Sequence, residues 1–180
     1  MKSLIQISKF LSLILRHQPE TIGLKLDDNG WANIEELIAK TNQKGQRLNR
    51  KLLDEVVTTN DKQRFAISDD GLSIRANQGH SLQVDLKLVA KQPPEVLYHG
   101  TATRFVTSIL ETGLQAKSRQ QVHLSSDIPT AIKVGKRHGK AIVFTVAAQQ
   151  MYTDGYLFYL SENQVWLTEK VPSKYLQQNN

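Results

Sequence analysis

Cysteine is missing from this chain of 180 residues, and long apolar runs are missing too. The absence of cysteine excludes disulfides, thiolate metal sites and a cysteine nucleophile, and it agrees with a reducing compartment. A membrane span needs about eighteen apolar residues in a row and a signal peptide needs an unbroken apolar centre. Polar residues interrupt the apolar start of this chain. We therefore expect an unprocessed, cytoplasmic protein with no membrane partner. We also expect a monomer.

Glycine-rich phosphate loops are also missing. Neither the Walker A pattern nor the dinucleotide-fold glycine pattern occurs, so any nucleotide would bind without these two common loops. A zinc site could use His99, His123 and His138, but neither H-x-x-x-H nor H-E-x-x-H spacing occurs and no carboxylate is suitably placed. We expect no metal.

Basic residues moderately outnumber acidic ones. The chain has 23 lysines and arginines against 17 aspartates and glutamates, a formal net charge of +6. This balance favours polyanionic partners without requiring one. One basic stretch, with no acidic residue between Glu36 and Asp54, contains Lys40, Lys44, Arg47, Arg50 and Lys51. The stretch is either an ordinary solvated helix or a nucleic-acid contact.

The first part of the chain has the periodicities of a small α+β domain. Apolar residues at helical spacing predict a first helix that Ser3 caps and Pro19 ends. The segment GLKLDDNGWANIEELIAK predicts a short strand, an Asp-Asn-Gly turn and a helix with Asn33 as its N-cap. The segment RLNRKLLDEVVTTN predicts another helix.

A hairpin signal completes this first pattern. The segment RFAISDDGLSIRANQG has two alternating stretches joined by Asp-Asp-Gly, which predicts two antiparallel strands. Helix, strand, helix, helix and hairpin is the order of elements in a winged-helix module. We therefore expect a winged-helix lobe here.

The consecutive prolines of KQPPEV mark a domain boundary, because they favour an extended linker. We expect domains over residues 1–92 and 93–180. In the second domain, VLYHGT predicts a strand that ends at a glycine turn, and helices are predicted at ATRFVTSILETGL, closed by Gly113, and at IPTAIKVGKRHG. Further strands are predicted at QQVHLSS, KAIVFTVAA, GYLFYLS and QVWLTEKV. The second domain is thus predicted to be antiparallel-rich α+β.

Arg16 and His17 stand side by side where the first helix is predicted to end. They can simply complement the negative end of the helix dipole. Alternatively they bind an anion, because an arginine fork holds two phosphate oxygens and an adjacent imidazole can donate a hydrogen bond. Arg64 and Arg119 lie beside segment boundaries, where each is either a surface arginine or a side chain that reaches into a cleft.

The tripeptide His99-Gly100-Thr101 is either a common turn or a place where bare glycine backbone approaches a flat ligand. In the next predicted strand, His123 and Ser125 share one face by alternation.

Together these stretches resemble the RNA 2'-phosphotransferase family, also called tRNA 2'-phosphotransferase or KptA, over nearly the whole chain. The matching segments are LSLILRHQPETIGLKLDDNGW, QRFAIS, IRANQGHS, LYHGT, SRQQVHLS and GYLFYLSENQVWLTEKVP. One such segment could be an accident, whereas six in the family's order are highly specific.

The resemblance implies a winged-helix lobe and a C-terminal ADP-ribosyltransferase-like lobe, with NAD+ bound between them. It implies removal of an internal 2'-phosphate from RNA, such as one left at a tRNA splice junction. The 2'-phosphate expels nicotinamide from NAD+ to give 2'-phospho-ADP-ribosylated RNA. The neighbouring ribose hydroxyl then attacks that phosphate, which releases 2'-OH RNA and ADP-ribose 1'',2''-cyclic phosphate.

The resemblance also assigns residues. It implies a catalytic set of four residues, Arg16, His17, Arg64 and Arg119. Its implied NAD-binding residues are His99, Gly100, Thr101, His123, Ser125 and Val165, the last standing where toxin-like relatives have a catalytic glutamate. Family members often have a histidine where this chain has Gln121 and a glycine where it has Gln164.

Two rival functions are separable by experiment. The chain could be a winged-helix nucleic-acid-binding protein without catalysis, which would release no nicotinamide from NAD+. It could also transfer ADP-ribose to terminal phosphates of RNA or DNA and stop there.

Overall fold

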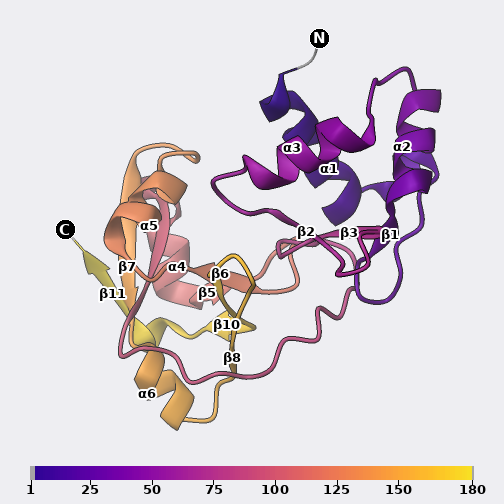
Figure 1. Cartoon of the computed structure of the whole chain (residues 1–180). Coiled ribbons are helices and arrows are strands. Elements are labelled where there is room, and N and C mark those ends of the chain that lie inside the picture. Colours follow the sequence, from indigo (N-terminus) through magenta and orange to yellow (C-terminus); the bar gives the residue numbers. More distant parts are fainter. Residues whose placement is uncertain (1–2, 180) are drawn as a thin grey trace. The chain divides into compact units, whose positions relative to one another are not determined.

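The computed structural model of the chain describes residues 3–179. Contacts divide the chain into two compact α+β units, of which the first ends at Lys87 and the second begins at Leu88 (Figure 1). Within residues 3–179, no helix is both long and apolar enough to cross a bilayer. The α+β class is therefore as expected, and each unit has its own architecture.

The first unit packs helices against a small antiparallel sheet. The helices are α1 (Leu4–Arg16), the short 3-10 helix η1 (Pro19–Ile22), α2 (Ile34–Gln43) and α3 (Arg50–Thr58). The sheet has the order β1-β3-β2, formed by β1 (Ala32–Asn33), β2 (Phe65–Ile67) and β3 (Ser73–Ala76). Leu11, Leu15, Leu53 and Ile74 are fully buried in the core between these elements.

Local capping explains where these helices begin. The Ser3 hydroxyl accepts a hydrogen bond from the Gln6 backbone N–H, and the Gln6 side-chain oxygen accepts one from the Ser3 backbone N–H, which makes a complete capping box. Asn33 caps α2, as predicted, by accepting from the backbone N–H of Glu36. Asn49 caps α3 in the same way, so that helix begins at Arg50 instead of at the start of the predicted segment.

The predicted strand at GLKL is wrong. Its residues carry no strand pairing, and β1 instead follows the turn at Ala32–Asn33, where it pairs with β3. The Asp27 side chain accepts from the backbone N–H groups of Asn29 and Trp31 and so fixes the turn. This turn is an Asx-type loop and not a two-residue hairpin turn, which is why a strand does not form before it.

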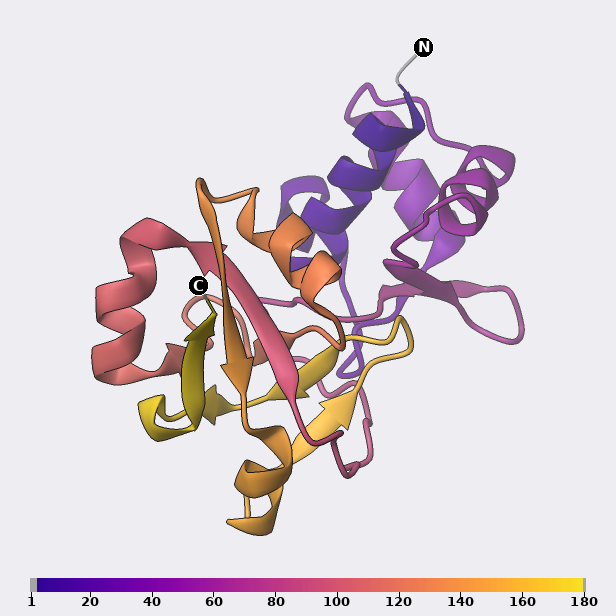
Figure 2. The same ribbon diagram turned by 90° about the vertical axis from the view of Figure 1, so that its left-hand side faces the viewer.

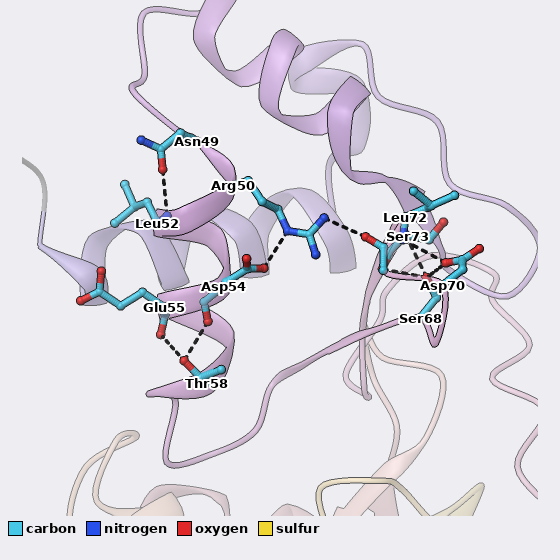
Figure 3. A network of polar contacts seen from close by, with 11 residues as sticks. Asn49, Arg50, Leu52, Asp54, Glu55, Thr58, Ser68, Asp70, Leu72 and Ser73 are labelled. Atoms are coloured by element: carbon cyan, nitrogen blue, oxygen red, sulfur yellow. Dashed lines mark hydrogen bonds and ion pairs between the residues drawn. The ribbon is translucent and has the colours of Figure 1, made fainter.

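The predicted hairpin of β2 and β3 is confirmed, and its connecting turn is strongly hydrogen-bonded. Ser68 donates its hydroxyl to Asp70, and Asp70 accepts from the backbone N–H of Leu72 (Figure 3). The pairing places Phe65 opposite Ala76. Residues just before β2 and just after β3 therefore lie side by side.

The second unit combines antiparallel sheets with helices. One sheet has the order β11-β7-β4, from β4 (Leu97–Ala102), β7 (Ala141–Val146) and β11 (Leu176–Asn179). Another has the order β6-β9-β8, from β6 (Val122–Leu124), β8 (Phe158–Leu160) and β9 (Trp166–Thr168). β5 (Leu114–Gln115) pairs with β10 (Lys170–Val171), and the helices are η2 (Thr103–Phe105), α4 (Val106–Thr112), α5 (Ile128–Gly135), α6 (Ala148–Thr153) and η3 (Ser173–Tyr175).

The predicted glycine turn in VLYHGT is wrong, because β4 continues through Gly100 to Ala102. Helix α5 lies along β4 and β7 (Figure 2). A Cβ atom built on Gly100 would lie 1.6 Å from the carbonyl oxygen of Ala131 in α5. Glycine at this position thus permits a close approach of helix to strand, not a change of chain direction.

Other expectations for the second unit are confirmed. Gly113 ends α4 with a φ of +75°, and Val122 and Leu124 are buried on the face of β6 opposite to His123. The sequence analysis missed β5, β11 and α6. β5 is only two residues long and β11 is mostly polar, so neither has a strand pattern of its own. Each is a strand because it pairs with a neighbour, β5 with β10 and β11 with β7.

Candidate active site

Arg16 and His17 lie at the end of α1, as the sequence predicted. Arg16 is the last helical residue and His17 is the C-cap, whose backbone N–H still donates to the Leu13 carbonyl at 3.0 Å. Pro19 begins η1 immediately afterwards, so the chain turns away and leaves both side chains at the helix end. Both are half-buried, and the Nε and Nη2 atoms of Arg16 are fully shielded.

The imidazole of His17 has a defined hydrogen-bond partner. Its Nδ1 atom lies 2.9 Å from the hydroxyl of Ser81, a residue 64 positions further along the chain. The ring orientation is therefore set by a contact that no local sequence pattern could reveal.

Arg64 immediately precedes β2 and is held against α1. Its Nη1 donates at 3.4 Å to the hydroxyl of Ser8 and at 3.4 Å to Oδ1 of Asn60. Asn60 donates in turn to the Ser8 hydroxyl at 3.0 Å, and Ser8 and Asn60 are both buried. Arg64 also lines a cavity of about 130 Å³ between α1 and the end of α3. The half-buried arginine is thus oriented by two buried polar side chains, unlike an ordinary surface arginine.

A buried histidine, His80, lies within the electrostatic influence of Arg16, His17 and Arg75. His80 is 2% exposed, and neither of its ring nitrogens has a hydrogen-bond partner among the described residues. Burial is the main cause that lowers the pKa of His80 to about 4, and the charges of Arg16, His17 and Arg75 contribute to the same shift. His80 is therefore neutral at pH 7, surrounded by cations.

Arg75 adds another positive group, and it packs over the ring of Trp31 at 4.5 Å from the ring centre. The ring contact orients the guanidinium without neutralising its charge. A group of cations with an uncharged imidazole among them is a suitable environment for an anion such as phosphate.

The basic stretch from Lys40 to Lys51 is partly engaged within the unit. Lys40 forms an ion pair with Glu36 at 2.6 Å and also donates to the Gly23 carbonyl. Arg50 pairs with Asp54 at 2.8 Å (Figure 3). It also donates to the Gly71 carbonyl at 2.8 Å. These contacts favour the reading of a solvated helix surface for this stretch.

In the second unit, His99, His123 and Arg119 are linked by hydrogen bonds. His99 is on β4, and its Nδ1 lies 3.1 Å from the His123 carbonyl. A carbonyl only accepts, so Nδ1 of His99 carries the proton and Nε2 is the acceptor of the neutral ring. Arg119 donates from Nη1 to Nδ1 of His123 at 2.8 Å, which places the ring proton of neutral His123 on Nε2.

The surroundings of this histidine pair are electropositive. Burial is the main cause that lowers the pKa of His99. The hydrogen bond to the His123 carbonyl raises this pKa, whereas the charges of His138, Arg119 and Lys117 lower it, and the net shift is downward. Partial desolvation and the charge of Arg137 lower the pKa of Arg119, which nevertheless stays a cation at neutral pH. Within residues 3–179, no group of three or more histidines or carboxylates could hold a metal ion.

Of the remaining predicted site residues of the second unit, two lie on β4, one directly follows β6 and one directly precedes β9. Gly100 and Thr101 follow His99 in β4, and both are buried. Ser125 exchanges backbone hydrogen bonds with Tyr98 at 2.7 and 2.9 Å, which joins β6 to β4. Extending the pairing of β6 with β9 by one residue puts Val165 opposite Ser125.

Gln164 occupies a strained position in the turn before Val165. Its φ is +61°, a left-handed conformation that glycine adopts more readily. A glycine at this position would adopt the same turn with less strain.

The structure brings His99, His123 and Arg119 together in the second unit and places Arg16 beside His17 in the first. It ties Arg64 to Ser8, which lies on the same helix as Arg16 and about 12 Å from it by the helical rise. The sequence analysis missed several functional candidates. They are Ser8, Asn60, Arg75, His80 and Ser81, and only the last three lie in a segment that carried the family resemblance, IRANQGHS.

Comparison with known proteins gives consistent matches along the chain. The sequence model described as "RNA 2'-phosphotransferase, Tpt1 / KptA family" matches residues 2–170. A protein of Flavobacterium johnsoniae named "Probable RNA 2'-phosphotransferase" is 58% identical over 171 residues, which cover 95% of this chain and 94% of that protein. Proteins of the same name from Rhodopirellula baltica and Hahella chejuensis are each 56% identical, over 97% of this chain and 96% and 94% of theirs.

Proposed function

Since the chain belongs to the RNA 2'-phosphotransferase, Tpt1 / KptA family, we propose that it is an NAD-dependent enzyme that removes an internal 2'-phosphate from RNA. The family is one of transferases, and the proposed substrate is RNA with a 2'-phosphate, such as a tRNA splice junction carries. The observation that carries the proposal is the paired placement of Arg16 and His17 at the end of α1.

In the proposed architecture the first unit is a winged-helix lobe. The element order α1, β1, α2, α3, β2, β3 and the sheet order β1-β3-β2 support this assignment. The second unit is proposed to be an ADP-ribosyltransferase-like lobe, a proposal supported by its antiparallel sheets and by the resemblance of LYHGT and SRQQVHLS.

The proposed reaction has two steps on the RNA. The RNA 2'-phosphate displaces nicotinamide from NAD+, and because this nucleophile is already an anion, the step needs orientation and charge neutralisation more than a base. Attack on the phosphate by the neighbouring ribose hydroxyl then gives 2'-OH RNA and ADP-ribose 1'',2''-cyclic phosphate. Charge builds up on the transferring phosphoryl group in this second step, where fixed guanidinium groups stabilise it.

We propose the catalytic set Arg16, His17, Arg64 and Arg119. Two observations support the three residues of the first unit as phosphate ligands. Arg64 is oriented by Ser8, and Arg16 and His17 are among the charged groups around His80. Arg119 is held in a fixed direction by its hydrogen bond to His123. Arginine forks held in this way match the bidentate geometry of phosphate oxygens.

The hydrogen-bonding and charged groups of the second unit are chemically suited to bind NAD+. The neutral His99 presents Nε2 as an acceptor, which fits a ribose hydroxyl, and the positive surroundings of this ring fit a pyrophosphate. When bound, NAD+ supplies a ribose carbon with a good leaving group. The residues proposed to bind it are His99, Gly100, Thr101, His123, Ser125 and Val165.

The test uses an RNA oligonucleotide with one labelled internal 2'-phosphate, incubated with the protein with and without NAD+. We expect NAD-dependent transfer of the label into ADP-ribose cyclic phosphate. Arg16→Ala should abolish the transfer, whereas Arg47→Ala, which removes an exposed arginine of the same unit, should preserve it.

Three outcomes would count against the proposal. Transfer without NAD+ would contradict the cofactor requirement. ADP-ribosylation that occurs only on terminally phosphorylated oligonucleotides would favour the alternative reaction. No reaction by the folded protein would favour a binding module.

A further inference from the structure

We propose that the segment from Asn77 to Ser81 is a positioning brace, which fixes the orientation of Arg16, His17 and Arg64. This inference rests on the proposed function, which assigns the RNA phosphate to those three residues. The segment follows directly after β3, and it contacts the chain near all three of them through the hydrogen bonds of its two ends.

Asn77 attaches one end of the brace to the turn before Arg64. Asn77 is 6% exposed, its backbone N–H donates to the Arg64 carbonyl at 2.9 Å, and its side-chain amide donates to the Gln63 carbonyl at 2.6 Å. Gln63 has a φ of +41°, a conformation that residues other than glycine rarely adopt. The Asn77 amide therefore holds a turn of unusual conformation, and this turn sets where the Arg64 side chain begins.

Ser81 attaches the other end to the last turn of α1. Its backbone N–H donates to the Arg16 carbonyl at 3.0 Å, in the part of a helix where carbonyls need donors from outside the helix. Its hydroxyl lies 2.9 Å from Nδ1 of His17. A hydroxyl can both donate and accept, so it can hold this ring in its neutral and in its protonated state.

The bond between Ser81 and His17 decides which ring atom serves the substrate. Because Nδ1 is engaged by the hydroxyl, Nε2 is the atom that His17 presents to a phosphate oxygen. Ser81 itself is exposed, and the residue before it, His80, is buried. The brace is thus anchored in the core of the first unit and carries the hydroxyl at its surface.

Some residues of this arrangement bind the phosphate, and others only hold those residues in place. Arg16, His17 and Arg64 come from separate elements, α1 and the turn before β2, whose relative placement otherwise depends on apolar packing and on the hydrogen bonds of Asn60 and Arg64 to Ser8. Hydrogen bonds are directional, whereas apolar packing is not, and a misplacement of about 1 Å can cost on the order of 10² in rate. Asn77 and Ser81 are positioning residues in this arrangement.

The experiment removes the Ser81 hydroxyl and observes the His17 ring. The variants are Ser81→Ala, Ser81→Thr, which keeps a hydroxyl, and Ser68→Ala as a matched control. Ser68 also hydrogen-bonds through its hydroxyl in the first unit, but to Asp70 and the Ser73 carbonyl. Nitrogen-15 signals of the labelled rings, assigned with His17→Gln, report whether Nδ1 of His17 is hydrogen-bonded.

We expect the Nδ1 signal of His17 to show a hydrogen bond in the wild-type chain, in Ser81→Thr and in Ser68→Ala, and to lose it in Ser81→Ala. In the phosphate-removal assay, Ser81→Ala should lower kcat on the order of tenfold, and Ser81→Thr should restore most of it. Unchanged ring signals in Ser81→Ala, or a loss of kcat that Ser81→Thr does not restore, would overturn the proposal.

The two readouts keep this inference separate from the proposed function. The ring signals are recorded without RNA or NAD+, so they test the brace even if the wild-type chain removed no phosphate, a result that would count against the proposed function alone. If Ser81→Ala failed to fold, Ser81→Cys would replace it, because the thiol preserves the size of the side chain and is a much weaker hydrogen-bonding group.

Discussion

Acidification should destabilise the first unit through His80, and the size of the effect follows from its burial. The pKa of this histidine is about 4 in the folded unit against 6.5 for an unperturbed imidazole, mainly because burial disfavours the charged ring. Between these two values the unfolded chain binds a proton at His80 that the folded unit does not bind. The contribution to stability is therefore fully present above about pH 6.5 and decreases as the pH falls toward 4.

The magnitude can be worked out from the two pKa values. Each pH unit within this window lowers the free energy of unfolding by up to about 1.4 kcal/mol. Preferential protonation of the unfolded chain at His80 therefore lowers this free energy by about 2 kcal/mol between pH 7 and pH 5, and by about 3 kcal/mol at pH 4. A loss of this size is a large fraction of the stability of a small unit. Carboxylates also titrate in acid, which is why a variant without the imidazole is needed for comparison.

The assay is urea unfolding at pH 7 and pH 5, followed by tryptophan fluorescence. The chain has two tryptophans, Trp31 in the first unit and Trp166 in the second, so Trp166→Phe leaves a single reporter in the unit that contains His80. The reference protein is the Trp166→Phe variant with His80 intact. Between pH 7 and pH 5, its free energy of unfolding should fall by about 2 kcal/mol more than that of the same variant with His80→Gln. His138→Gln, which removes an exposed histidine of the second unit, is the control and should behave as the reference.

Equal pH dependence of the reference and His80→Gln would refute the reasoning. It would mean that the imidazole is hydrated or charged in the folded unit, and that the cations around it are further away than the structure places them.

Three further predictions concern the arginines and two backbone positions. Each of Arg16→Ala, Arg64→Ala and Arg119→Ala should lower phosphate removal by a factor on the order of 10² or more in the labelled-RNA assay, and full turnover by a folded variant would remove that residue from the catalytic set. Gly100→Ala should destabilise the second unit by about 3 kcal/mol or more in thermal unfolding, because the added Cβ would lie 1.6 Å from a carbonyl oxygen of α5; an unchanged Tm would contradict this packing. Gln164→Gly should stabilise the same unit by about 1 kcal/mol in urea unfolding, since it relieves the left-handed φ of +61°, and a destabilised variant would show that the Gln164 side chain has a role that its turn does not reveal.

Local patterns were sufficient for much of the fold because local interactions form these elements. The helix from Ser3 was predictable because its cap, its apolar spacing and its terminating proline all lie within one short stretch. The hairpin of β2 and β3 was predictable for the same reason. The strand expected at GLKL was wrong because a polar turn can connect to a strand on either side, and only pairing with β3 decides which side is regular.

For the site, the sequence by itself determined residue types and their order. It put Arg16 beside His17 at the end of a helix, and it supplied the motifs that belong to the family. Only the tertiary structure decided what orients them, because the partners are distant in the chain: Ser81 for His17, Ser8 for Arg64. Hydrogen-bond geometry and burial depend on which segments meet in the folded chain, and no periodicity along the sequence encodes such meetings.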